Sequence, residues 1–182
     1  MPNWFVGFPA PSPSLLAGLS GAPAPLAALA VDDLHLTVAF LGAVDTDAAL
    51  RAWSEASGRR IPPFELTFGE PAWLGHPNHP SALALRPLEG VSIVEDVMRR
   101  IRHPIQAAAG APLEDRAPLA HVTIARLPRR ASDTERAQAE AWSRSHVWPA
   151  CRVEVAELAL YVGGAATEPG RRYRIDQRMR LG

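Results

Sequence analysis

The sequence contains no lysine, and all 19 of the basic side chains in its 182 residues are arginine. A lysine amine is required for Schiff-base chemistry, for a phosphate loop of the Walker type and for a ligase that stores a nucleotide on the enzyme. The sequence therefore excludes these three reaction classes. An excess of Ala, Pro, Gly and Arg points to codon bias as the cause, and the exclusion holds whatever the cause.

Cysteine is nearly as scarce, because Cys151 is the single one in the chain. One cysteine excludes an intramolecular disulfide, a thiolate metal cluster and a cysteine redox pair. It lies in the strand-like run Cys-Arg-Val-Glu-Val, where we expect it to be a small core side chain.

Long apolar runs are also missing, and the chain starts without the basic residues of a signal peptide. We therefore expect a cytoplasmic protein that neither crosses nor binds a membrane. With 47% apolar residues the chain can bury a core, and its length predicts a single domain over residues 1–182.

The formal net charge is zero, but the charges are unevenly distributed. Residues 1–91 carry four Arg and eight acids, and residues 92–182 carry fifteen Arg and eleven acids. The end of the chain holds five arginines around the single acid Asp176, namely Arg171, Arg172, Arg174, Arg178 and Arg180. Such a cluster is either a solvated basic tail or a surface that attracts phosphate.

Periodicity and turn residues predict an α+β chain. The expected strands cover residues 3–8, 34–41, 64–68, 81–88, 121–127, 153–162 and 173–178. The expected helices cover about 46–57, 91–109 and 132–146, with Pro104 kinking or interrupting the second. The two halves follow a similar order of elements, so we expect two pseudo-equivalent lobes.

One short pattern occurs twice, as His35-Leu-Thr37-Val-Ala-Phe40 and, 86 positions later, as His121-Val-Thr123-Ile-Ala-Arg126. Random placement of six His and six Thr would give roughly 0.2 His-x-Thr triplets, so two in matching strand contexts are a specific signal. In a strand, each His and its Thr point to the same face.

If the lobes bring the two strands together, two imidazoles and two hydroxyls face one cavity. This set suits a phosphodiester, because one His can accept a proton, the other can donate one, and the hydroxyls can hold the phosphate oxygens. Both imidazoles titrate near neutral pH without a metal.

Arg126 is a further candidate to bind the phosphate, but strand alternation places it on the face opposite His121 and Thr123. A twist or bulge near Ala125 is required to bring it to their side. Two other interpretations of the histidines are buried core residues and a metal site. The second lacks carboxylate or thiolate partners at ligand spacing, because Asp32 and Asp33 suit a turn.

The repeated motif resembles that of the RNA 2′,3′-cyclic phosphodiesterases, or 2′-5′ RNA ligases, of the two-histidine (2H) phosphoesterase superfamily. The resemblance includes the Phe-Leu-Gly after Val38 and Ala39, the arginine of the second motif and the N-terminal strand. It implies a bilobal, pseudo-symmetric fold with two mainly antiparallel sheets and outer helices around a central cleft.

The resemblance further implies hydrolysis of a 2′,3′-cyclic phosphate to a 2′-phosphate without metal or cofactor. His35 would be the general acid and His121 the general base, with Thr37, Thr123 and Arg126 on the phosphate. Phe40 would lie near the base of a substrate that is an RNA end or an oligonucleotide. We expect the protein to act as a monomer.

Two alternatives remain open from the sequence. One is a non-catalytic protein that binds RNA ends or nucleotides, and the other is a 2H phosphodiesterase for a small cyclic nucleotide. The motifs address the phosphate and not the rest of the substrate, so they do not distinguish these alternatives.

Overall fold

A computed structural model describes residues 1–76, 79–164 and 170–182. Its strands are β1 (Trp4–Pro9), β2 (Ala27–Ala28), β3 (His35–Gly42), β4 (Phe64–His76), β5 (His79–Glu89), β6 (Val122–Arg126), β7 (Cys151–Val155), β8 (Glu157–Gly163) and β9 (Tyr173–Arg180). Its helices are α1 (Thr46–Ser57), α2 (Val91–Ala109) and α3 (Asp133–Ser145), with short 3₁₀ helices at Pro13–Leu19 and Val31–Asp33.

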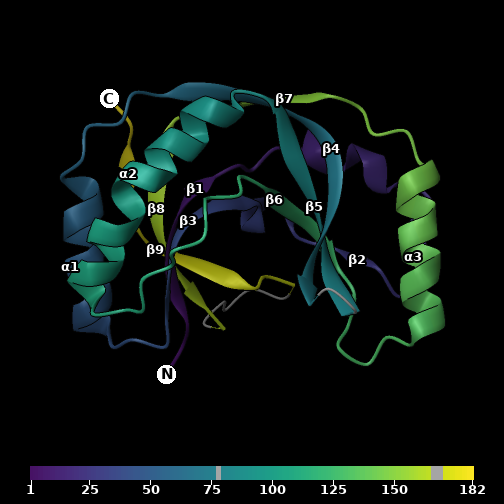
Figure 1. Ribbon diagram of the computed structural model, residues 1–182, viewed down its shortest axis with the longest axis horizontal. Helices are drawn as coiled ribbons and strands as arrows, with labels where there is room; N and C mark the ends of the chain where they lie inside the picture. The colour runs from purple at the N-terminus through teal and green to yellow at the C-terminus, as the bar shows by residue number, and fades with distance from the viewer. Residues whose placement is uncertain (77–78, 165–169) are drawn as a thin grey trace.

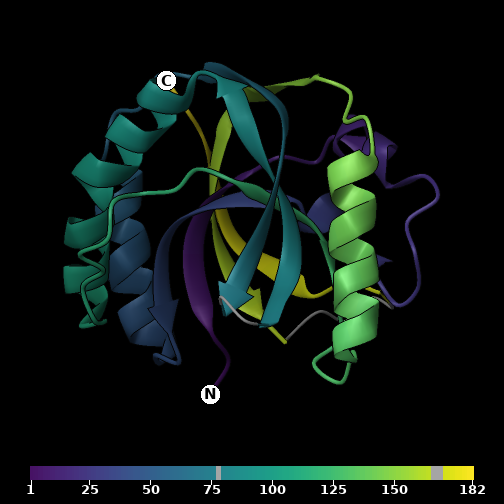
Figure 2. The same cartoon turned by 45° about the vertical axis from the view of Figure 1, so that its right-hand side comes forward.

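The strands form two antiparallel sheets. One has the order β3-β1-β8-β9 and the other the order β2-β6-β5-β4-β7. Helices α1 and α2 cover the outer side of the first sheet and α3 lies outside the second (Figures 1 and 2). The expected α+β class with two lobes and outer helices is therefore confirmed.

Each lobe draws strands from both ends of the chain. The first sheet joins β1 and β3 to β8 and β9, so the lobes do not correspond to the two halves of the sequence. The acidic first half and the basic second half of the sequence therefore do not form one lobe each. β3 is at the edge of its sheet, only the two-residue β2 lies outside β6, and β3 and β6 are in contact. The two motif strands therefore meet where the sheets adjoin.

Side chains cap the first turns of α1 and α3. The Asp45 carboxylate accepts the Ala48 N–H at the start of α1, and Ser132 and Glu135 form a capping box at the start of α3. Helix α2 covers the expected residues, and of the two effects expected of Pro104 an interruption is wrong, because the helix continues through it to Ala109. Its apolar face is buried along the whole length, and this packing outweighs one lost backbone hydrogen bond.

The single strand expected over residues 153–162 is also wrong. β7 ends at Val155, β8 begins at Glu157, and the two strands belong to different sheets. Ala156 is the residue at which the chain crosses between the lobes. No helix among the described residues combines the length and apolarity needed to cross a bilayer.

Candidate active site

A cleft of about 660 Å³ contains both copies of the repeated motif. Every residue that the sequence analysis proposed for the site lines it, namely His35, Thr37, Phe40, His121, Thr123 and Arg126. The cleft is also lined by Phe5, Leu29 and by Arg171, Arg172 and Tyr173 just before or at the start of β9.

The two histidines are held in the same way. Nδ1 of His35 lies 2.6 Å from the carbonyl oxygen of Asp33, and Nδ1 of His121 lies 2.7 Å from that of Leu119. A carbonyl only accepts, so each Nδ1 carries the proton and donates it. In the neutral state each Nε2 is then left as the basic nitrogen, which can accept or return a proton.

A one-residue bulge follows each motif threonine. In β3 the partners of Val6 and Gly7 are Ala39 and Thr37, so Val38 is the extra residue. In β6 the partners of Leu83 and Ala84 are Ala125 and Thr123, so Ile124 is the extra residue. A bulge shifts the alternation by one position.

The bulges explain why the sixth residue of each motif reaches the cleft. Strand alternation alone would place Arg126 opposite Thr123, but the bulge brings it to the same side, as expected if it is to bind the phosphate. The bulge in β3 brings Phe40 to the side of Thr37 in the same way. Beside the first bulge, a Cβ on Gly7 would lie 2.7 Å from the Leu36 carbonyl oxygen. The close approach of β1 to β3 therefore requires glycine.

Comparison with known proteins agrees with this geometry. A family model of the 2′-5′ RNA ligase superfamily matches residues 22–166, which include both motifs. The chain belongs to the 2′-5′ RNA ligase superfamily. No curated protein matches it by sequence.

Solved structures share the superfamily fold. Escherichia coli LigT complexed with NADP⁺ is 20% identical with a TM-score of 0.70, over 99% of this chain and 97% of LigT. LigT complexed with 3′-AMP is 22% identical with a TM-score of 0.68, over 100% and 99%. A Thermus thermophilus protein is 16% identical with a TM-score of 0.69, over 98% and 97%.

In this superfamily member the two histidines differ in their surroundings. Three aromatic rings pack against His35, with centroid distances of 4.6 Å to Phe5, 5.0 Å to Tyr161 and 5.1 Å to Tyr173. No ring contact of this kind surrounds His121 in the described part of the chain. The pseudo-symmetric motifs therefore have unequal environments.

The aromatic rings affect the protonation of His35. Burial, followed by the nearby His121 and Arg126 charges, lowers the pKa of His35 to about 4, even though the Asp33 carbonyl and carboxylate favour the imidazolium. Burial also lowers the pKa of His121, with Arg126 and Arg86 acting in the same direction. Both histidines are consequently neutral in the free site at neutral pH.

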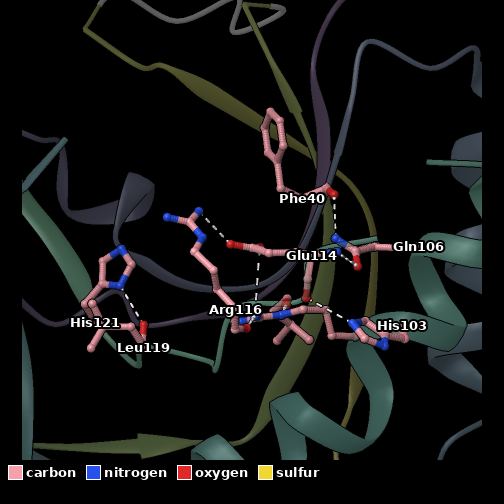
Figure 3. A network of polar contacts seen from close by, with 9 residues as sticks. Phe40, His103, Gln106, Glu114, Arg116, Leu119 and His121 are labelled. Atoms are coloured by element: carbon pink, nitrogen blue, oxygen red, sulfur yellow. Dashed lines mark hydrogen bonds and ion pairs between the residues drawn. The ribbon is translucent and has the colours of Figure 1, made fainter. Parts of the chain in front are cut away.

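Two polar side chains of α2 form hydrogen bonds to β3 and to the segment that precedes His121. The buried Arg102 donates from Nε to the carbonyl of the bulge residue Val38 (2.9 Å) and from Nη1 to the carbonyl of Arg116 (3.3 Å). One turn later, Gln106 donates to the Phe40 carbonyl and accepts the Glu114 N–H (Figure 3). These bonds satisfy carbonyls beside the bulge and tie β3 to the segment that leads into His121.

Three parts of the site are not evident from the sequence. These are the aromatic residues around His35, the hydrogen bonds of Arg102 and Gln106, and the position of Asp33. Asp33 is wholly buried and not an exposed turn residue. Among the described residues no group of three or more His, Cys, Asp or Glu side chains could hold a metal ion.

Four of the five arginines near the C-terminus have an assigned place in the structure. Arg171 and Arg172 line the cleft, whereas Arg174 pairs with Asp176 (3.1 Å) and Arg178 with Glu157 (3.3 Å). The basic stretch is thus partly a set of surface ion pairs within the sheet. Because Arg171 also pairs with Asp32 and Asp33, Arg172 is the one of these arginines that adds uncompensated positive charge to the cleft among the described residues.

Proposed function

We propose that the chain hydrolyses ribose 2′,3′-cyclic phosphate ends of RNA or oligonucleotides to 2′-phosphates, without a metal. The observation that carries the proposal is the pair of histidines in one cleft, each with Nδ1 tied to a carbonyl. Two threonine hydroxyls and Arg126 line the same cleft. Superfamily membership supports phosphoesterase chemistry.

In the proposed step a water oxygen attacks phosphorus and the bond from phosphorus to O3′ breaks. His121 accepts the proton of the water, and His35 gives a proton to O3′, so one water is consumed and the histidines exchange protonation states. Thr37 and Thr123 donate to the non-bridging oxygens, and the Arg126 guanidinium offsets their charge. These roles follow the superfamily resemblance.

The role of His35 as acid depends on the substrate. In the free site, burial keeps this imidazole neutral. The bound cyclic phosphate is an anion, and an adjacent negative charge favours the imidazolium. Binding would therefore supply the condition under which His35 carries the proton that it donates.

A nucleotide substrate suits the rest of the cleft. Phe40 is 50% exposed, so its ring can stack on a base, and Arg172, which also lines the cleft, adds positive charge. Solved complexes of LigT contain 3′-AMP, ATP and phosphate. If the chain also joins RNA 2′-5′, the energy must come from the cyclic phosphate, because no lysine can carry a nucleotide.

The test is an assay of an RNA oligonucleotide with a 2′,3′-cyclic phosphate end, in the presence of EDTA, beside a cyclic mononucleotide. The proposal predicts turnover of the RNA end in EDTA. Turnover of the mononucleotide alone would favour a small cyclic nucleotide as substrate. Salt-sensitive RNA binding without hydrolysis would identify a non-catalytic binder and overturn the proposal.

A further inference from the structure

Asp33 is the single acidic side chain that is buried among the described residues, with no exposed surface. It lies at the end of a 3₁₀ helix, two residues before His35. A carboxylate removed from water needs donors to remain charged, so its partners indicate what it organises.

The partners of the Asp33 carboxylate all lie in the segment that enters β9. Oδ2 accepts the backbone N–H of Arg172 (2.7 Å), and Oδ1 accepts Nε of Arg171 (2.9 Å) and the backbone N–H of Tyr173 (3.4 Å). Charge-assisted bonds to two successive amides fix the backbone of this segment. They do so where the Arg172 and Tyr173 side chains line the cleft.

The backbone of Asp33 forms a hydrogen bond to one of the two motif histidines. Its carbonyl accepts Nδ1–H of His35, and the edge-on Tyr173 ring lies 5.1 Å from the same imidazole. One residue therefore fixes a proton-transfer group, an aromatic ring packed against it and the backbone of Arg172. The Arg172 side chain forms no ion pair with a described acid, which leaves its charge available to a ligand.

We propose that Asp33 is a positioning residue, which holds Arg172 and His35 in the arrangement that receives the phosphate. The inference rests on the proposed function, but it concerns a residue that does not itself line the cleft. Its neighbour Asp32 provides a matched control. The Asp32 side chain is 69% exposed and also contacts Arg171 (3.3 Å), without reaching the two amides.

The experiment compares Asp33→Asn with Asp32→Asn, using inorganic phosphate binding by titration calorimetry and turnover of the cyclic-phosphate RNA. Asn keeps the shape but loses the charge and one acceptor. For Asp33→Asn we expect phosphate affinity and kcat/KM per folded protein each to fall about tenfold or more, the loss typical of a hydrogen bond to a charged group. Asp32→Asn should stay within about twofold of the wild type.

A double-mutant cycle with Arg172→Gln separates positioning from general stability. If Asp33 acts through Arg172, Asp33→Asn should weaken phosphate binding far less in the Arg172→Gln background than in the wild type. Should Asp33→Asn not fold, Arg171→Gln removes one of the three donors and keeps both amide bonds. It should give a smaller loss of phosphate affinity with the same non-additivity.

Equal phosphate affinity of the Asp33 and Asp32 variants, or full additivity with Arg172→Gln, would overturn the inference. So would a wild type that binds no phosphate. Failure of the proposed function is a different result, namely no hydrolysis by the wild type, and the phosphate titration still tests Asp33 in that case.

Discussion

Phe40 and Arg126 occupy equivalent positions in the two motif strands, each three residues after the motif threonine and each returned to the cleft by a one-residue bulge. The same backbone device thus presents an aromatic ring from one lobe and a cation from the other. Under the proposed function the ring would stack on a base and the guanidinium would bind the phosphate, so the two equivalent positions would contact two parts of a nucleotide.

Replacing Arg126 tests the cationic half of this arrangement. Arg126→Gln should lower kcat/KM for the cyclic phosphate about 100-fold, because a preorganised charge in the cleft is lost. Arg130→Gln, on the exposed turn after the same strand, is the control and should change kcat/KM by less than about twofold. Equal effects of the two substitutions in steady-state kinetics would show that Arg126 contributes only to the general positive field.

The hydrogen bonds that Arg102 of α2 donates should contribute to the free energy of unfolding. Arg102→Met removes the donors to the Val38 and Arg116 carbonyls, and we expect the free energy of unfolding to fall by roughly 2 to 4 kcal/mol. Arg99→Met on the exposed side of the same helix should change it by less than about 0.5 kcal/mol. Urea unfolding followed by circular dichroism measures both, and similar values would contradict a role of Arg102 in holding the bulge.

The motifs could be recognised from the sequence because they depend on local pattern. His35 and Thr37 share a face in any extended strand, and the capping box at Ser132 is a matter of spacing. The bulges could not be located, since Val38 and Ile124 are ordinary strand residues. Their extra position is defined only by the partner strands.

Long-range partners set the remaining limits. Asp33 suits a turn by composition, and its burial depends on Arg171, Arg172 and Tyr173, which are about 140 positions away. Nothing local distinguishes it from Asp32. The same holds for Ala156, whose place between two strands of different sheets is decided by tertiary pairing.

The lowered pKa values predict the pH dependence of catalysis. Productive chemistry needs one proton shared by the pair, so kcat/KM of the free enzyme should be highest between the two pKa values of the pair. Burial lowers the pKa of His35 to about 4 and lowers that of His121 from its ordinary 6.5. We therefore expect a bell-shaped profile with its maximum on the acidic side of pH 6.5. A maximum above pH 7 would show that burial does not lower the pKa values of the two histidines in the free cleft.

The pKa of His35 also links folding to pH. Because its folded-state pKa lies below the unfolded value of 6.5, the unfolded chain binds the extra proton, and stability present above pH 6.5 is lost as the pH falls towards about 4. The shift corresponds to about 3 kcal/mol. Urea unfolding at pH 7 and pH 4.5 should show a smaller loss for His35→Gln than for the wild type. Equal losses would show that the aromatic rings do not keep His35 neutral.

The identity of the product tests the central claim most directly. An RNA oligonucleotide with a 2′,3′-cyclic phosphate end is incubated with the wild type in EDTA, and the product is assigned by ³¹P NMR. We expect a 2′-phosphate, with rates at least about 100-fold lower for His35→Ala and for His121→Ala, both still folded by circular dichroism. A 3′-phosphate, or near-normal turnover by either histidine variant, would contradict two-histidine cleavage of the bond to O3′.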